Sequence, residues 1–264
     1  MFFFNAFFNI QSVDKNINIF CEDFVTCIKA NNKENSNTFY TGLFNGKLIE
    51  WKINNNFEVN VVKHIYSHYS PITIIELYNR QNIIITAGED KYIHIRKQYD
   101  FELLTAINLN YCYSNPIVSE NINIFPSLIK ISDLNLLYVI LYDLDTETNF
   151  IRGYNLNGLF FAQTDPLYFK DQKINLLFNN ISFTKNSNLV IGFSNSDKLY
   201  ILNASNLKPL WIKDIKKGIE KKQKNEIKMI DYNFKNEEFY ILYENEFIIM
   251  TLKDKKEQKE FDLF

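Results

Sequence analysis

Cysteine, glycine and proline are all scarce in this 264-residue sequence, which holds 3, 7 and 5 of them respectively. The cysteines, Cys21, Cys27 and Cys112, are odd in number and widely spaced, so they do not form the framework of a disulfide-rich protein. This usage favours a reducing compartment. With so few glycines, the chain also has no glycine-rich run that could cradle a phosphate group.

A strong charge of either sign and a long apolar run are also missing. The 29 Lys and Arg against 31 Asp and Glu residues leave a formal net charge of −2, without the positive excess that nucleic-acid binding usually needs. No stretch approaches the roughly 18 consecutive apolar residues of a membrane span. The apolar start MFFFNAFF has no basic residues before it, so we interpret it as a β-strand and not as a signal peptide. We therefore expect a cytoplasmic protein with no membrane insertion and no nucleic-acid partner.

What the sequence does have is apolar and aromatic surface to bury. Hydrophobic residues make up 46% of the chain and aromatic residues 16%, a composition that suits a β-rich interior. Short apolar runs bounded by Asn, Asp, Ser or Gly recur throughout, and residues 47–53 and 91–96 alternate with a period of two. This pattern predicts strands with one buried face.

A larger unit repeats along the chain: an apolar strand, a second strand ending in a small residue, a tight polar turn, and then two further strands. Copies of this unit begin near residues 25, 72, 137, 189 and 226, and strands at 7–10 and 16–20 precede them. Gly88 follows Gly42 by 46 residues, close to the roughly 40–45 residues of a WD-type propeller blade. A β-sandwich, the alternative for such strand-rich spacing, lacks a four-strand unit repeated in register.

The repeat predicts an all-β fold, a β-propeller of four-stranded antiparallel blades. We expect about six blades, and an incomplete ring or a part of a larger ring stays open as an alternative. Residues 1–253 would form the propeller, and residues 254–264 a charged C-terminal tail in which 261–264 could add a closing strand. An exposed sheet edge invites unwanted pairing, which is why a ring is expected to close.

Three residues are candidates for structural roles in this repeat. In WD repeats a buried histidine ahead of the first strand bonds an aspartate in the tight turn before the third strand. His68 and Asp90 occupy these places here, and we expect them to satisfy each other's hydrogen bonds. Trp51, followed by Lys52, holds the tryptophan position of the Trp-Asp dipeptide. One repeat before Asp90, Asn45 stands in the turn.

Several short segments resemble the C-terminal WD-repeat region of BEACH-domain proteins, which are large scaffolds of membrane traffic. These segments are Val13–Phe20, Phe24–Ile28, Tyr40–Gly42, Leu48–Trp51, Arg152–Leu159 and Ala204–Leu210. The resemblance implies a protein-interaction scaffold in membrane trafficking. It covers neither the BEACH helical domain nor a pleckstrin-like domain, so the activities of those modules do not carry over.

Sites that could support catalysis or metal binding are few. His64 and His68 are four residues apart but are expected in a loop beside Pro71, with no third ligand near, so a structural role for His68 is favoured over a metal. His94 alternates on a strand and is expected at the surface or between blades. The acidic stretch 143–147 resembles a calcium loop but lacks the glycine required at its sharp turn.

We therefore expect no catalytic residue, no metal and no cofactor, and a non-enzymatic scaffold that binds other proteins through its propeller faces. The alternatives are a propeller hydrolase with a metal or carboxylates in its channel, and a WD-repeat subunit of another assembly such as ciliary transport or RNA processing. The basic stretch Lys213–Lys228 is expected to be a solvated loop. Peripheral association with vesicle or organelle membranes, through this stretch or through other subunits, is the second option.

Overall fold

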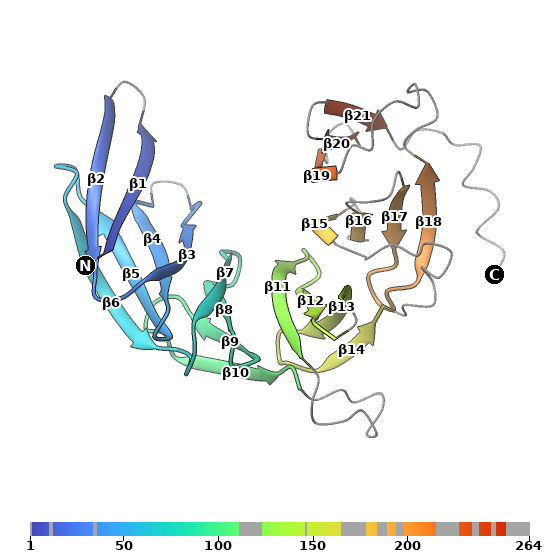
Figure 1. Ribbon diagram of the computed structural model, residues 1–264, viewed down its shortest axis with the longest axis horizontal. Coiled ribbons are helices and arrows are strands. Elements are labelled where there is room, and N and C mark those ends of the chain that lie inside the picture. Colours follow the sequence, from blue (N-terminus) through green and yellow to red (C-terminus); the bar gives the residue numbers. More distant parts are fainter. Residues whose placement is uncertain are drawn as a thin grey trace. The chain divides into compact units, whose positions relative to one another are not determined.

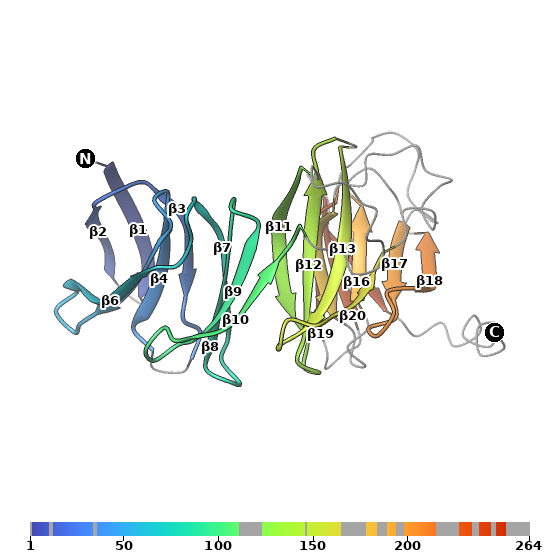
Figure 2. The ribbon, with the colours of Figure 1, turned by 90° about the horizontal axis from the view of Figure 1, so that it is seen from below.

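The computed structural model is built from β-strands alone in the part of the chain that it describes, which comprises residues 2–10, 13–33, 36–110, 123–145, 147–164, 178–183, 189–193, 198–214, 227–233, 238–243 and 247–251. The chain divides into two compact units, Met1–Ser127 and Leu128–Phe264, with the boundary inside one strand. Within these described ranges no helix is present that could cross a membrane. Figures 1 and 2 show the strands in two views.

The first unit holds a hairpin and two four-stranded antiparallel sheets. The hairpin pairs β1 (Phe2–Ile10) with β2 (Val13–Cys21). The next sheet has the order β3-β4-β5-β6, and the third has the order β10-β9-β8-β7. Their strands are β3 (Val25–Ala30), β4 (Thr38–Leu43), β5 (Lys47–Ile53), β6 (Val59–Tyr66), β7 (Ile72–Tyr78), β8 (Ile83–Gly88), β9 (Tyr92–Lys97) and β10 (Leu103–Asn108).

The second unit holds two further four-stranded antiparallel sheets and one three-stranded sheet. Its sheets have the orders β11-β12-β13-β14, β15-β16-β17-β18 and β19-β20-β21. Their strands are β11 (Ile124–Ile131), β12 (Leu136–Asp143), β13 (Thr148–Asn155), β14 (Phe160–Gln163), β15 (Phe178–Phe183), β16 (Leu189–Phe193), β17 (Lys198–Leu202), β18 (Pro209–Asp214), β19 (Ile227–Asn233), β20 (Glu238–Tyr243) and β21 (Phe247–Thr251).

Each four-stranded sheet is a meander in which strands adjacent in sequence pair with each other, so the predicted four-strand unit is confirmed. The middle strands are the most buried: every residue of β8 is buried, as are five of the six residues of β4. The outer strand β6 is half exposed along its length. The burial of both faces of β8 fits its sequence, a run of three isoleucines followed by Thr-Ala-Gly.

Apolar side chains join neighbouring sheets within each unit. In the first unit, Tyr40 and Leu48 pack with Ile72, Ile84 and Phe101 of the following sheet. The opposite face of the same sheet carries a second cluster, formed by Ile19, Phe39, Leu43, Ile49 and Trp51. Burial of such side chains contributes about 1.5–3 kcal/mol each, so these contacts are the main source of stability between sheets.

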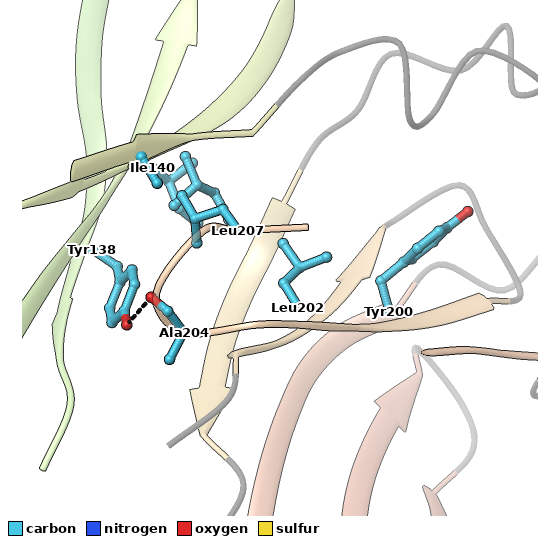
Figure 3. Packing of buried hydrophobic residues seen from close by; sticks show 8 residues of the cluster. Tyr138, Ile140, Tyr200, Leu202, Ala204 and Leu207 are labelled. Atoms are coloured by element: carbon cyan, nitrogen blue, oxygen red, sulfur yellow. Dashed lines mark hydrogen bonds between the residues drawn. The ribbon is translucent and has the colours of Figure 1, made fainter. Parts of the chain in front are cut away.

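In the second unit, residues of β12 pack against the β17 region (Figure 3). Tyr138 and Ile140 belong to one buried cluster with Leu202, Ala204 and Leu207, and the Tyr138 hydroxyl donates a hydrogen bond of 2.9 Å to the Ala204 carbonyl. Burial raises the pKa of Tyr138 to about 12. The neutral phenol is therefore retained as a donor across the physiological pH range.

Candidate binding surface on the first unit

Four connections of the first unit lie at the same edge of its sheets, because strands alternate in direction along the chain (Figure 2). We call residues 22–24, 44–46, 67–71 and 89–91 the loop edge. Backbone hydrogen bonds join these loops: Phe44 N donates to Phe24 O at 2.9 Å, and Ser67 N to Gly46 O at 2.9 Å. Glu89 N donates to Pro71 O at 3.1 Å. The loop edge is thus a connected backbone surface and not a set of independent loops.

Two glycines allow these loops to lie so close together. Gly46 has a φ of +81°, and a Cβ atom placed on it would lie 2.0 Å from the carbonyl oxygen of His68. A Cβ atom on Gly88 would lie 2.8 Å from His68 Nδ1. A side chain at either position would clash with His68, so both residues must be glycine. Gly46 also needs glycine because its φ is positive.

Beneath the loop edge, a chain of side-chain hydrogen bonds runs from a cation to a carboxylate. Arg96 Nε donates to Ser67 Oγ at 3.2 Å, and Ser67 Oγ lies 3.2 Å from Thr86 Oγ1. Thr86 Oγ1 lies 2.9 Å from His68 Nε2, and His68 Nδ1 lies 3.0 Å from both oxygens of Asp90. The Asp90 carboxylate can only accept, so His68 donates to it through Nδ1. Nε2 of the neutral imidazole then accepts from the Thr86 hydroxyl, and each donor in the series points from Arg96 toward Asp90.

Asp90 also holds the loops directly. Its Oδ2 accepts from the backbone N–H of Tyr69 at 3.1 Å, and its Oδ1 from that of Tyr92 at 3.1 Å. Although burial of the carboxyl acts to raise its pKa, the bonds from His68 and these two N–H groups lower it. The ionised Asp90 therefore fixes the backbone that presents Tyr69 at the surface.

His94 adds a stacked ring to this group. Its ring lies 4.3 Å from that of His68, centroid to centroid, at an interplanar angle of 20°. Burial is the main cause that lowers the pKa of His94 to about 4, the Arg96 guanidinium acts in the same direction, and the Asp90 carboxylate acts in the opposite one. The prediction that His94 is a surface or interblade group therefore misses its place against His68.

The preceding sheet carries a different set of polar contacts in the corresponding positions. Trp51 Nε1 donates to Thr41 Oγ1 at 2.8 Å, both residues being buried. Asn45 stands where Asp90 stands in the next sheet, and it accepts from the backbone N–H of Lys47 at 3.1 Å. The Lys47 ammonium reaches Glu22 at 2.6 Å, a hydrogen bond that lowers the pKa of Glu22. One sheet thus keeps the tryptophan contact and the next keeps the histidine–aspartate contact.

The order aspartate, histidine, hydroxyl in Asp90, His68 and Thr86 matches that of a hydrolase triad. Its environment does not, because the Thr86 residue and the His68 side chain have no exposed surface. A nucleophile must reach a substrate carbonyl, and a hydroxyl enclosed in the middle of a sheet cannot. These three residues can hold the loops in place, but they cannot carry out acyl transfer.

Large aromatic side chains project from the loop edge into solvent. Tyr69 is 101% exposed, Tyr66 at the end of β6 is 64% exposed, and Phe44 is 55% exposed. Phe24, 49% exposed, lies edge-on to Phe44 with ring centroids 6.3 Å apart. Exposed rings gathered on a fixed backbone are typical of a protein-interaction surface.

The opposite edge of the same sheets is different in character. Its loops are joined by amide side chains and lysines, such as Gln98, which donates to Asn79 at 3.1 Å and accepts from Lys33 at 3.3 Å. A cavity of about 410 Å³ opens there beside Asn31 and Asn54, lined by amide, hydroxyl and apolar side chains. None of the described lining residues is titratable, so the described lining offers no acid or base that could activate its hydroxyl groups.

The remaining predicted sites are placed as follows. His64 lies in β6, opposite Ile49, so the prediction that it lies in a loop is wrong: an outer strand is half exposed and mixes polar with apolar residues. Among the described residues, no group of three or more His, Cys, Asp or Glu side chains is close enough to bind a metal. Cys21 and Cys27 are free thiols, and Cys112, residues 215–226 of the basic stretch and the tail 254–264 lie outside the described residues.

Four-stranded antiparallel meanders that follow one another along the chain are the blades of a β-propeller. The chain is similar to a chain in the crystal structure of the mitotic checkpoint complex, with a TM-score of 0.57 and 12% sequence identity. The match covers 87% of this chain and 64% of the other, so this chain spans about two thirds of that length. No family model and no curated protein matches the sequence. The chain therefore has an all-β fold of the β-propeller class.

Sequence reasoning missed Ser67, Thr86, Thr41 and Arg96 as parts of the polar contacts. Thr41 and Thr86 each lie four residues before the turn residue Asn45 or Asp90, and this shared offset is the signal that could have found them. Arg96 lies six residues after Asp90, as Trp51 does after Asn45, but its Nε donates to Ser67 and reaches Thr86 only through that hydroxyl.

Proposed function

We propose that this chain is a non-enzymatic protein-interaction scaffold that binds partner proteins through its loop edge. The observation that carries this proposal is the set of four exposed aromatic side chains on a hydrogen-bonded backbone: Phe24, Phe44, Tyr66 and Tyr69. The fold supports it, since WD-repeat propellers are typical scaffolds, and the similar solved chain belongs to a multiprotein complex. Among the residues that the structure describes, no group of three or more His, Cys, Asp or Glu side chains lends support to the metal form of the hydrolase alternative.

The physics of binding favours this edge over the rest of the first unit. Aromatic side chains bury a large area on binding and lose few rotamers, and they are enriched among the residues that dominate binding energies. The loops that carry them are held by the Gly46 and Asp90 contacts before any partner arrives. Little conformational entropy is therefore lost on association.

Cross-linking of the full chain in cells, followed by mass spectrometry, tests the proposal. Cross-links to partner proteins are expected near the loop edge, and the double substitution Phe44→Ala and Tyr69→Ala should reduce partner recovery by tenfold or more. Tyr99→Ala is the matched control, because Tyr99 is 69% exposed but lies between β9 and β10 at the opposite edge. Partner recovery that is unchanged by the double substitution would refute the role of the loop edge.

A finer proposal concerns the setting of this scaffold. The resemblance of residues 13–28 and 152–159 to BEACH-domain proteins supports a role in membrane trafficking, in the cytoplasm or on the surface of vesicles or organelles. Fluorescence microscopy of the tagged chain with vesicle markers tests it. Cytoplasmic signal with a vesicle-associated fraction is expected, whereas accumulation on cilia or in the nucleus would favour a different assembly.

A further inference from the structure

The charge around the exposed rings of the loop edge is uneven. The four loops carry the carboxylates of Glu22, Asp23, Glu89 and Asp90, against the ammonium group of Lys91. Lys47 borders them at the start of β5. The carboxylates of Glu22 and Glu89 are exposed, whereas Lys47 is buried. The surface presented to a partner is therefore aromatic and acidic.

The lysines at this edge are already engaged. Lys47 Nζ pairs with Glu22 at 2.6 Å and lies 5.6 Å from the ring centroid of Tyr66. Lys91 Nζ lies 5.7 Å from the ring centroid of Phe125. Aromatic rings in and beside the loop edge thus accept cations within the molecule itself. Rings that are open to solvent, such as that of Tyr69, offer the same electron-rich face to an incoming cation.

Resting on the proposed function, we propose that the loop edge binds a peptide segment of a partner protein that carries arginine together with apolar residues. Arginine fits both features of the surface, because its planar guanidinium stacks on aromatic faces and forms paired hydrogen bonds with carboxylates. The rings of Phe44 and Tyr69 contact the guanidinium and apolar side chains, and Asp23 and Glu89 bind the charge. Asp90 is a positioning residue, since it fixes the Tyr69 backbone.

Fluorescence anisotropy with the full chain and short labelled peptides tests this assignment. Three peptides share a backbone of Gly, Ser, Pro and Leu and differ only in carrying Arg, Gln or Glu at the same positions. The Arg peptide should bind at least tenfold more tightly than the Gln peptide, and the Glu peptide should be weakest. Raising salt from about 50 to about 300 mM should weaken the Arg peptide most.

Substitutions then locate the binding. Tyr69→Ala and Phe44→Ala should each weaken the Arg peptide about tenfold, Tyr69→Phe should retain binding, and Glu89→Gln should weaken it a few-fold. These side chains are exposed, so the melting curve should not change, and Tyr99→Ala at the opposite edge is the control. Equal binding of the Arg and Gln peptides, or an equal loss with Tyr99→Ala, would overturn the assignment.

The two proposals fail in different ways. If cellular cross-links map to the loop edge while the Arg and Gln peptides bind equally, the preference for arginine is wrong and the scaffold function stands. If cross-links avoid the loop edge altogether, the proposed function itself is wrong, whatever the peptides do.

Discussion

Replacing His68 by alanine should destabilise the first unit by about 2–4 kcal/mol. The imidazole has no exposed surface, bonds Asp90 at 3.0 Å and Thr86 at 2.9 Å, and stacks on His94 at 4.3 Å. Removal of a buried partner costs about 1–3 kcal/mol for the groups left behind, and the lost ring contacts add about 1 kcal/mol. The expected effect is therefore well above that of an ordinary surface substitution.

Urea unfolding followed by the fluorescence of Trp51 measures this effect in the correct unit. Trp51 is buried in the first unit, and a Trp211→Phe background removes the other tryptophan of the chain. With a slope of about 2 kcal/mol per molar urea, the midpoint should fall by roughly 1–2 M. His64→Ala is the matched control, since His64 is exposed on β6 and should change stability by less than about 0.5 kcal/mol. Equal midpoints for the two variants would refute the conclusion that the hydrogen bonds from Arg96 to Asp90 stabilise the first unit.

Three further predictions follow from the described contacts. His94 resists protonation until about pH 4 in the folded state, whereas an unfolded histidine takes up its proton near pH 6.5. Stability should therefore fall by about 2–3 kcal/mol as the pH drops through this window, and His94→Gln should flatten the slope of urea midpoints against pH. Gly46→Ala should cost more than about 2 kcal/mol, because the new Cβ atom meets the carbonyl of His68; an unchanged melting temperature would contradict this. Tyr138→Phe should lower stability by about 1 kcal/mol through loss of the bond to Ala204, and a neutral result in thermal melts would argue against that bond.

The inner strands of the repeat could be predicted from the sequence because they are buried on both faces. Residues 83–86 form an uninterrupted β-branched run that leads through Ala87 and Gly88 into a polar turn, and β8 spans Ile83–Gly88. The outer strand β6 was missed because it is exposed along one side and includes Asn60, Lys63 and His64, so it lacks a clear apolar pattern. β11 was also missed; it contains Pro126, a residue that usually argues against a strand.

The candidate binding surface could be predicted only in part. The places of His68 and Asp90 follow from their spacing to the turn, whereas the surface depends on which loops meet in space. Phe24 and Phe44 are 20 residues apart in sequence, and only antiparallel pairing brings their rings within 6.3 Å. Exposure of an aromatic residue is likewise a property of the fold. Phe39 and Phe44 are the same residue type and only five positions apart, yet they are 1% and 55% exposed.

The split of polar contacts between neighbouring sheets shows how little this backbone path depends on particular residues. A Trp–Thr bond in one sheet and an Asp–His–Thr series in the next hold equivalent strands by different chemistry. One architecture is therefore compatible with very different sequences, as the similarity to a solved chain at 12% identity also illustrates.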